Sequence, residues 1–425
     1  MKYQFERRHS RWYEQLLFSA LFQFLLGCLF VIFLPGWLRW EAITFFDPFG
    51  GIQLNTLLAN LGAFVISFVS LRRLRRYPGA QTQAFILPTI TFTYLLAVAC
   101  LLFLREEYSR QVLLSSFIAA NFWFFAGYFL GRKYRVPKLA LVPFGRALEL
   151  VNHKNAMVCM LENPDLEGRR YDAVVADLHS KELPPDWERF LARCTLAHVP
   201  VWHFKPVGES LSGRVRIEHL SENDFGSLLP PLFYLGFKRF VDTLATLLLL
   251  PVFAPIMIVT AILIKLDSCG PIFFVQKRMG YRGAAFYVYK FRSMCHDVKG
   301  SDFTEAIDDP RITRVGRVIR KYRIDELPQI FNVIKGEMSF IGPRPESVEL
   351  SDWYERDVPF FSYRHVVRPG ISGWAQVMQG YAAEVDGMTE KLQYDFYYIK
   401  HFSLWLDILI VFKTIRTILT GFGAR

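Results

Sequence analysis

Long apolar segments alternate with short polar stretches over the first third of the chain. Four such segments lie at about 15–38, 53–71, 84–104 and 111–130. Each is close to the ~20 residues that a helix needs to cross a bilayer. Buried helices of a large soluble protein are the alternative, but four in succession make it the weaker one. We therefore expect residues 1–134 to form four transmembrane helices.

Basic residues gather at alternate ends of these segments. They precede the first segment and follow the second and the fourth, as Arg7, Arg8, Arg11, Arg72, Arg73, Arg75, Arg76, Arg132, Lys133 and Arg135. Under the positive-inside rule, the N-terminus and everything after residue 132 face the cytoplasm. The first apolar run is too long for a signal-peptide core and no small-residue cleavage site follows it, so we expect it to remain as an anchor.

Between residues 135 and 225 the pattern changes to short apolar runs separated by more polar stretches. The runs are KLALVPF, AMVCMLE, YDAVVADL and VPVWHF, with helix-like stretches such as DWERFLARCTLAH between them. This alternation predicts a small α/β domain with a parallel sheet. The turn after the first run, PFGRALEL, has one glycine where the dinucleotide-binding fingerprint needs three. We expect a degenerate Rossmann-like domain with a structural or regulatory role, followed by a linker near 221–232.

A fifth apolar run extends from Phe240 to Leu266 and carries two prolines, Pro251 and Pro255, in its middle. Each proline removes a backbone donor and clashes with the preceding turn. Basic residues stand at both ends of the run, as Lys238, Arg239, Lys265, Lys277 and Arg278. This pattern favours a broken helix at about 238–266 that enters the inner leaflet and returns to the cytoplasmic side. A proline-kinked helix that crosses the bilayer is the alternative.

Composition supports a membrane protein and narrows the partners. Hydrophobic residues make up 52% of the 425 residues, which is too many for an ordinary soluble protein. The formal charge of +11 would suit nucleic acid, an anionic membrane surface or a phosphorylated substrate. The apolar segments favour the last two, so we expect no nucleic acid. The six cysteines show no CxxC pair and no histidine at metal-ligand spacing, so neither a disulfide framework nor a zinc site is indicated.

The candidate chemistry lies in the stretch from Arg311 to Pro345, at the adjacent acids Asp325 and Glu326. The Leu-Pro that follows them is typical of a helix start. Two adjacent carboxylates ionise together only if cations compensate their repulsion. A Mg²⁺ ion shared between one carboxylate and a diphosphate would do so, and the other carboxylate could then attack phosphorus. Taken alone, such a pair is more often a solvated helix start.

Cations close to this pair in the sequence favour a metal and diphosphate site over a solvated helix start. They stand in the motifs KFRSM, DDPRITRVG and GPRP and just before the acids, as Lys290, Arg292, Arg311, Arg314, Arg320 and Arg344. Arginines bind diphosphates with two parallel hydrogen bonds and spread the charge of phosphoryl oxygens. Pro343 and Pro345 stiffen the turn that carries Arg344, so that side chain has little entropy to lose.

The run from about Lys238 to Gly423 resembles the bacterial sugar transferase family, the polyprenyl-phosphate phosphoglycosyl transferases of the monotopic type. The motifs that carry the resemblance are KRFVD, VQKRMG, KFRSM, DDPRITRVGRVIRK, IDELPQIFNVIKGEMSFIGPRP, RPGISGWAQV, YDFYYI and SLWLDILIVFKTI. The preceding spans and α/β domain resemble the long form of the family, the galactose or glucose phosphotransferases that begin O-antigen, capsule or exopolysaccharide synthesis.

The resemblance implies a reaction and a set of roles. Asp325 would attack the β-phosphate of a UDP-sugar, release UMP and pass the phosphosugar to undecaprenyl phosphate. Glu326 would bind Mg²⁺, Arg320 a phosphate, and Arg344, between Pro343 and Pro345, the nucleotide. Lys290, Arg292 and Arg311 would also bind the substrate. The chain would work at the cytoplasmic face of the bacterial inner membrane, as a homodimer.

These expectations combine into one architecture. It is a membrane protein of mixed α and α/β class, with a four-helix N-terminal bundle, a degenerate Rossmann-like domain at 135–225 and a mainly helical catalytic domain at 226–425 that holds the re-entrant helix. The rival enzyme class is a membrane glycosyltransferase that attacks the sugar carbon and releases UDP. That class usually needs a D-x-D metal motif, and none occurs here. A non-enzymatic scaffold or transport protein is the third possibility.

Overall fold

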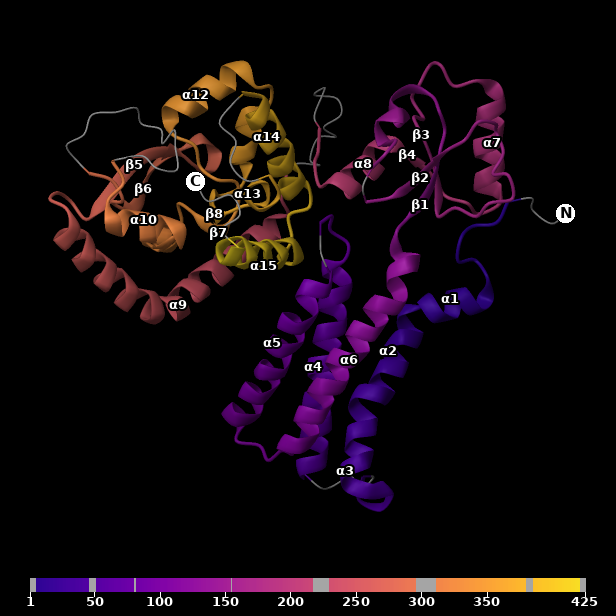
Figure 1. Ribbon diagram of the computed structural model, residues 1–425, viewed down its shortest axis with the longest axis horizontal. Helices are drawn as coiled ribbons and strands as arrows, with labels where there is room; N and C mark the ends of the chain where they lie inside the picture. Colours follow the sequence, from indigo (N-terminus) through magenta and orange to yellow (C-terminus); the bar gives the residue numbers. More distant parts are fainter. Residues whose placement is uncertain are drawn as a thin grey trace. The chain divides into compact units, whose positions relative to one another are not determined.

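The computed structural model describes residues 5–45, 51–79, 82–153, 155–216, 229–295, 311–379 and 385–420 (Figure 1). The chain divides into two compact units, Met1–Gly213 and Arg214–Arg425. The first unit contains the predicted membrane helices and the α/β domain, and the second contains the predicted catalytic domain. The boundary lies some twelve residues before the end of the expected α/β domain.

The N-terminal helices are long and apolar, as the hydrophobic pattern predicts. The elements are α1 (Trp12–Phe18), α2 (Ala20–Cys28), the π-helical turn η1 (Leu29–Phe33), α3 (Leu34–Phe45), α4 (Gly51–Leu74), α5 (Thr82–Leu104) and α6 (Arg110–Arg135). Figure 1 shows α2, α4, α5 and α6 side by side. Among the described residues five helices are long and apolar enough to cross a membrane. Four of them lie here, namely Ala20–Trp40, Gly51–Leu74, Gln83–Leu104 and Arg110–Arg132, and the fifth is Leu232–Asp267 in the second unit. Gly27 lets α2 approach its neighbours, because a Cβ there would lie 2.4 Å from the Phe64 ring.

The α/β domain is built on a four-stranded parallel sheet, which confirms that prediction. Its elements are β1 (Lys138–Leu141), η2 (Gly145–Leu150), β2 (Met157–Met160), β3 (Ala173–Ala176), α7 (Pro185–Leu196), β4 (Val201–His203) and α8 (Phe204–Ser212). The strand order is β2-β1-β3-β4. Because strand side chains alternate, Ala140 packs with Phe190 of α7 on one face and Leu139 packs with Phe204 of α8 on the other. After β1 the chain forms β2 on one side of that strand and then β3 on its other side. The topological switch point of the sheet therefore lies between the carboxyl ends of β1 and β3.

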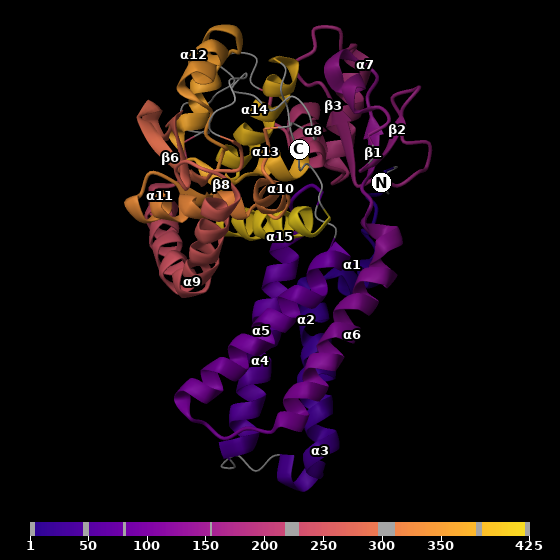
Figure 2. The same ribbon diagram turned by 60° about the vertical axis from the view of Figure 1, so that its left-hand side comes forward.

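The second unit begins with α9 (Leu232–Asp267), a helix of 36 residues that contains both predicted prolines. A straight helix of that length would extend about 54 Å. Figures 1 and 2 show instead that α9 bends near its middle, where Pro251 and Pro255 lie. The helix is continuous across the bend, so the predicted break is a kink rather than an interruption. Two prolines four residues apart bend one side of the helix without ending it.

Both arms of α9 return to the same set of elements. Near its start, Arg239 donates hydrogen bonds to the carbonyls of Val333 and Ile334. At its end, Asp267 accepts a hydrogen bond of 3.1 Å from the backbone of Val315. Between these contacts, apolar residues of both arms share one core with the strands and short helices around them: Leu250, Phe253, Met257, Ala261, Ile264, Phe291, Ile319 and Ile330.

The rest of this unit is mainly helical, as expected, with two small sheets. An antiparallel pair, β5 (Phe273–Met279) and β6 (Ala285–Phe291), is joined through the turn η4 (Tyr281–Gly283). A parallel pair follows, β7 (Ser339–Ile341) with β8 (Gly370–Ser372). The helices are α10 (Arg314–Lys321), η5 (Ile324–Gln329), α11 (Ile330–Lys335), α12 (Val348–Asp357), η6 (Phe361–Val366), α13 (Trp374–Met378), α14 (Val385–Lys400) and α15 (Leu404–Thr420).

Two glycines place the turn that carries Arg344. A Cβ on Gly370 would lie 2.1 Å from the backbone nitrogen of Gly342, and a Cβ on Gly342 would lie 2.4 Å from the carbonyl oxygen of Arg368. Only glycine therefore allows the ends of β7 and β8 to pack this closely. The Pro-Arg-Pro turn leaves β7 at this point of contact.

Candidate active site

The acidic pair lies in η5, a 3₁₀ helix of six residues that runs directly into α11. The helix start predicted from Leu-Pro is therefore present. Arg323, the residue before the turn, has φ 58° and ψ 22°, the left-handed conformation. Asp325 and Glu326 stand in the first turn rather than at the cap. Their side chains leave a tight turn at different angles, which gives two neighbouring carboxylates different surroundings.

Glu326 is buried at the centre of three cations. Its Oε1 accepts a hydrogen bond of 2.8 Å from Arg344 and lies 3.4 Å from both Lys290 Nζ and Arg323 Nη1. Lys290 comes from β6 and Arg344 from the turn after β7, so three segments distant in sequence meet at one carboxylate. The structure thereby brings together Lys290, Glu326 and Arg344, which the sequence analysis proposed as parts of one site.

The charges around Glu326 determine its ionisation. Burial alone would raise the pKa of the Glu326 carboxyl, but Arg344, Lys290 and Arg323 outweigh it and hold that pKa well below its usual range. Burial lowers the pKa of Lys290 to about 8, against the attraction of Glu326. The pKa of Arg344 is raised, chiefly by Glu326. At neutral pH Glu326 is therefore ionised and its three partners are mainly charged, a net positive cluster that suits a diphosphate.

Asp325 has the opposite environment. Burial, and then the charge of Glu326, raise the pKa of the Asp325 carboxyl to about 6. Its Oδ1 is buried and has no hydrogen-bond partner among the described residues. Above pH 6 the group is ionised but poorly stabilised, because the neighbouring cations are engaged with Glu326. An ionised oxygen without a donor keeps its lone pairs available for attack on an electrophile.

The backbone of the Pro-Arg-Pro turn is held by two further arginines. Arg278 donates to the carbonyl of Pro345, and Arg364 donates to the carbonyl of Arg344 at 2.9 Å. Arg364 is buried and pairs with Asp395 at 2.8 Å. Glu346, the residue after the turn, pairs with Lys391 and with Arg364. These contacts fix the position of Arg344 before any substrate is bound.

Sequence reasoning did not single out this supporting set. Arg278 stands in VQKRMG and Asp395 in YDFYYI, so the motifs contained them without revealing their role. Arg364 and Asp395 are 31 residues apart, and their pairing depends on how α14 packs on η6. The only available signal was that charged residues occur within otherwise apolar and aromatic stretches.

The remaining predicted residues lie elsewhere around the site. Arg292 is buried and donates hydrogen bonds of 2.7 Å to the carbonyls of Ser268 and Cys269, so its guanidinium binds the chain that follows α9 and is not brought to the acidic pair. Arg320 lies in the last turn of α10, and its carbonyl accepts a hydrogen bond from the backbone of Arg323. Arg311 pairs through its carbonyl with the backbone of Cys295. Pro343 and Pro345 are buried, on either side of Arg344.

Part of one predicted motif cannot be placed. In DDPRITRVG, the two aspartates at 308 and 309 lie outside the described residues, and Arg314 begins α10.

Comparison with known proteins gives a consistent set of similarities. Residues 233–421 match the family described as "Bacterial sugar transferase". The chain is 53% identical over 423 residues to a UDP-N-acetylgalactosamine-undecaprenyl-phosphate N-acetylgalactosaminephosphotransferase of Aeromonas hydrophila, covering 99% of this chain and 100% of that protein.

Two further relatives match less than half of this chain. A UDP-glucose:undecaprenyl-phosphate glucose-1-phosphate transferase of Xanthomonas campestris pv. campestris is 44% identical over 181 residues, 42% of this chain and 37% of that protein. An enzyme of the same description from Caulobacter vibrioides is 42% identical over 186 residues, 43% of this chain and 70% of that protein. The similarity to the Aeromonas hydrophila protein covers 99% of this chain and therefore includes the membrane helices and the α/β domain.

Proposed function

Because the chain belongs to the bacterial sugar transferase family, we propose that it is a phosphoglycosyl transferase that moves a sugar 1-phosphate from a UDP-sugar to undecaprenyl phosphate. The observation that carries the proposal is the buried pair of carboxylates with opposite environments. One is surrounded by three cations able to bind a diphosphate, and the other presents an unpaired oxygen beside them.

In the first step Asp325 is the nucleophile. A carboxylate oxygen of Asp325 forms a bond to the β-phosphorus of the UDP-sugar, and the bond from that phosphorus to the bridging oxygen breaks. UMP leaves with the electron pair of that bond, and the phosphosugar remains as an acyl phosphate. In the second step a phosphate oxygen of undecaprenyl phosphate attacks the same phosphorus and releases the Asp325 carboxylate. Substrate and product each contain a phosphoric anhydride, so an acyl phosphate between them loses little free energy.

Lys290, Arg323 and Arg344 bind the diphosphate in this scheme. In the structure they are paired with Glu326, and an incoming diphosphate offers them more negative charge than one carboxylate. As they shift toward phosphate oxygens, they stabilise the charge that passes to UMP. Arg344 binds the nucleotide phosphate in this scheme, because Arg278 and Arg364 hold the backbone of its turn in place.

Mg²⁺ is the proposed metal cofactor, and the donor set suits it. Carboxylate oxygens are the ligands that Mg²⁺ takes together with substrate phosphates, and the buried Oδ1 of Asp325 has no donor among the described residues. Glu326, with the diphosphate of the substrate, would hold the ion, which would neutralise charge on the phosphates. Arg344, Lys290 and Arg323 must first be drawn away from Glu326, so metal and diphosphate should bind together rather than separately.

The sugar proposed first is N-acetylgalactosamine. The full-length relative acts on UDP-N-acetylgalactosamine by its name, whereas the relatives named for glucose match less than half of this chain. We place the reaction at the cytoplasmic face of the inner membrane, where α9 enters one leaflet and returns, because its bend leads both arms back to the catalytic elements. There it would begin the synthesis of a surface polysaccharide, and the chain would act as a homodimer.

The nucleotide released tests the reaction class. Purified protein in lipid nanodiscs is incubated with undecaprenyl phosphate, Mg²⁺ and one of UDP-N-acetylgalactosamine, UDP-N-acetylglucosamine, UDP-galactose or UDP-glucose. The proposal predicts UMP in amounts equal to the lipid product, fastest with UDP-N-acetylgalactosamine. Asp352→Asn, an exposed aspartate of α12, serves as a control with unchanged rate. Release of UDP would assign the chain to the glycosyltransferase class instead.

A further inference from the structure

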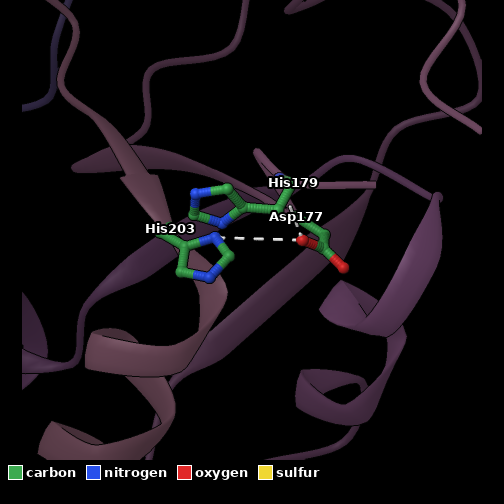
Figure 3. A group of neighbouring side chains, drawn as sticks. All are labelled: Asp177, His179 and His203. Carbon is green, nitrogen blue, oxygen red and sulfur yellow. Dashed lines mark hydrogen bonds and ion pairs between the residues drawn. The ribbon is translucent and has the colours of Figure 1, made fainter. Parts of the chain in front are cut away.

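A second cluster of chemically active side chains lies in the α/β domain. Asp177 follows β3, His203 ends β4, and His179 stands in the turn after Asp177. Figure 3 shows the two imidazoles and the carboxylate converging. Each residue offers one potential ligand atom, and these atoms all lie within 4.8 Å of one another. The cluster is at the carboxyl edge of a parallel sheet, the edge at which α/β domains bind their ligands.

The carboxylate of Asp177 is held in place by backbone donors. Its Oδ2 accepts a hydrogen bond of 3.1 Å from Arg146, and its Oδ1 accepts one of 3.2 Å from His179. Gly145 makes the first of these contacts possible. It has φ +59°, and a Cβ there would lie 2.7 Å from Asp177 Oδ2. The single glycine of the turn after β1 therefore serves the approach to this carboxylate, in place of the pyrophosphate that the full fingerprint would bind.

The two atoms that face each other across the cluster are both hydrogen-bond acceptors. Leu178 donates its backbone N–H to His203 Nδ1 at 3.3 Å, so this nitrogen carries a lone pair. It lies 4.0 Å from Asp177 Oδ1. Two acceptors with no donor between them repel, and a cation shared between them removes the repulsion. A cation bound to His203 Nδ1 would take the lone pair that accepts from Leu178.

His179 completes the set from the solvent side. Its ring meets that of His203 edge to face, with centroids 4.9 Å apart and planes at 86°. The side chain is exposed, so it can adjust without disturbing the core. Ligands of a tetrahedral ion with bonds of about 2.0–2.2 Å lie roughly 3.4 Å apart. Asp177 Oδ1 and His203 Nδ1 must approach by about 0.6 Å to reach that spacing, and the widest pair in the cluster by up to about 1.4 Å.

We propose that Asp177, His179 and His203 bind a divalent transition-metal ion of the Zn²⁺ type. Two imidazole nitrogens and one carboxylate oxygen suit Zn²⁺, whereas Mg²⁺ prefers an all-oxygen shell. Three protein ligands leave one position open to water or an anion. The ion links the ends of β3 and β4 and, through Asp177, the turn after β1. The α/β domain is thereby a metal-binding module, with a ligand class that differs from that of the catalytic unit.

Metal titration of the full chain tests this. Tag-free protein, freed of metal with a chelator and returned to millimolar Mg²⁺ so that oxygen sites are filled, is titrated with Zn²⁺ by calorimetry and with Co²⁺ by visible absorption. The expected result is one tight site per chain with the d–d spectrum of a four-coordinate nitrogen and oxygen set. His179→Gln and His203→Gln each weaken binding at least about tenfold.

His198→Asn is the matched control. It is an exposed histidine of the same domain with φ 58°, a conformation that asparagine tolerates, and it should bind the metal like the unchanged chain. Because His179 is exposed, its replacement leaves the fold intact, and an unchanged melting temperature without metal confirms this. Absence of a stoichiometric site, or equal affinity in His179→Gln and His198→Asn, would overturn the proposal. In that case His203 and Asp177 form only an ion pair when the imidazole is protonated.

Discussion

Glu326 in the second unit and Asp177 in the first are both buried carboxylates, and they are surrounded in opposite ways. Glu326 is met by Arg323, three residues before it, and by Lys290 and Arg344 from distant segments, whereas Asp177 is met by backbone N–H groups and two imidazoles. The first arrangement keeps positive charge ready for a diphosphate. The second leaves lone pairs converging on a point, which favours a metal ion. The groups that reach a carboxylate determine what it can bind, and its burial alone does not.

Within the first centre, the contrast between Asp325 and Glu326 is tested by replacing each in turn. Asp325→Asn should lower turnover by more than about 10⁴-fold, because the nucleophile is removed. The same change should raise the melting temperature at pH 8 by about 2–4 °C, since it removes a carboxylate that burial disfavours.

The stability gained in Asp325→Asn depends on pH, because the pKa of Asp325 is raised in the folded chain. The pKa of Asp325 is raised to about 6 in the folded chain, above its ordinary value near 3.8. The cost of ionising it is therefore fully present above pH 6 and disappears as the pH falls toward 4. Thermal unfolding in detergent at pH 8 and pH 4 measures both ends. A stability loss at pH 8 would contradict the environment described for Asp325.

Glu326→Gln should have the opposite effect on stability. It leaves Lys290, Arg323 and Arg344 without their common anion, and breaking such a buried pair costs about 3–5 kcal/mol. Turnover should fall by about 10²–10³-fold. Glu355→Gln, on the exposed side of α12, should change neither quantity. A melting temperature equal to that of Asp325→Asn would remove the distinction between the two carboxylates.

Arg344→Lys tests whether geometry as well as charge matters in the Pro-Arg-Pro turn. Lysine keeps the charge but loses the planar fork, so kcat/KM for the UDP-sugar should fall about 30–100-fold with little change in stability. Arg356→Lys, in the last turn of α12, is the control, because it makes the same substitution away from the site and should leave kcat/KM unchanged. An effect below threefold would mean that Arg344 serves only to neutralise Glu326.

Acid should inhibit the first half-reaction. With the pKa of Asp325 raised to about 6, protonation removes the nucleophile below that pH, and the rate of UMP release should fall about tenfold per pH unit. Stopped-time assays between pH 5 and 8 measure this fall in the rate of UMP release. A rate of UMP release that stays constant down to pH 5 would contradict a pKa of about 6 for Asp325.

The smallest expected effect is at Arg292. Because its guanidinium binds the carbonyls after α9, Arg292→Gln should lower kcat/KM by less than about threefold while lowering the melting temperature. A loss comparable to that of Arg344→Lys, at unchanged melting temperature, would restore the substrate-binding role that its position in KFRSM predicted.

Much of the organisation was predictable because it depends on local periodicity. The apolar helices follow from the length of the apolar runs, and the parallel sheet follows from short apolar runs separated by helix-like stretches. Lys290, Glu326 and Arg344 were predictable as a site because the chemistry of diphosphate binding restricts the residue types. The support of Arg344 by Arg278 and Arg364 was not, since it depends on packing between segments far apart in the chain.

The metal cluster shows the same limit. Asp177 and His203 are separated by 26 positions and meet only because β3 and β4 are neighbours in the sheet. No zinc-type spacing of cysteines and histidines occurs in the sequence, and the single glycine after β1 pointed to a lost nucleotide site. Its contact with Asp177 becomes visible only when the turn is folded over the end of β3.

The central claim is that Asp325 carries the phosphosugar, and trapping that intermediate tests it most directly. Protein is mixed with UDP-sugar labelled in the sugar, with Mg²⁺ but without undecaprenyl phosphate, quenched within seconds and digested for mass spectrometry. The account predicts one phosphosugar on the peptide containing Asp325, matched by one equivalent of UMP, and neither in Asp325→Asn. An adduct on another residue, or an undiminished adduct in Asp325→Asn, would contradict it.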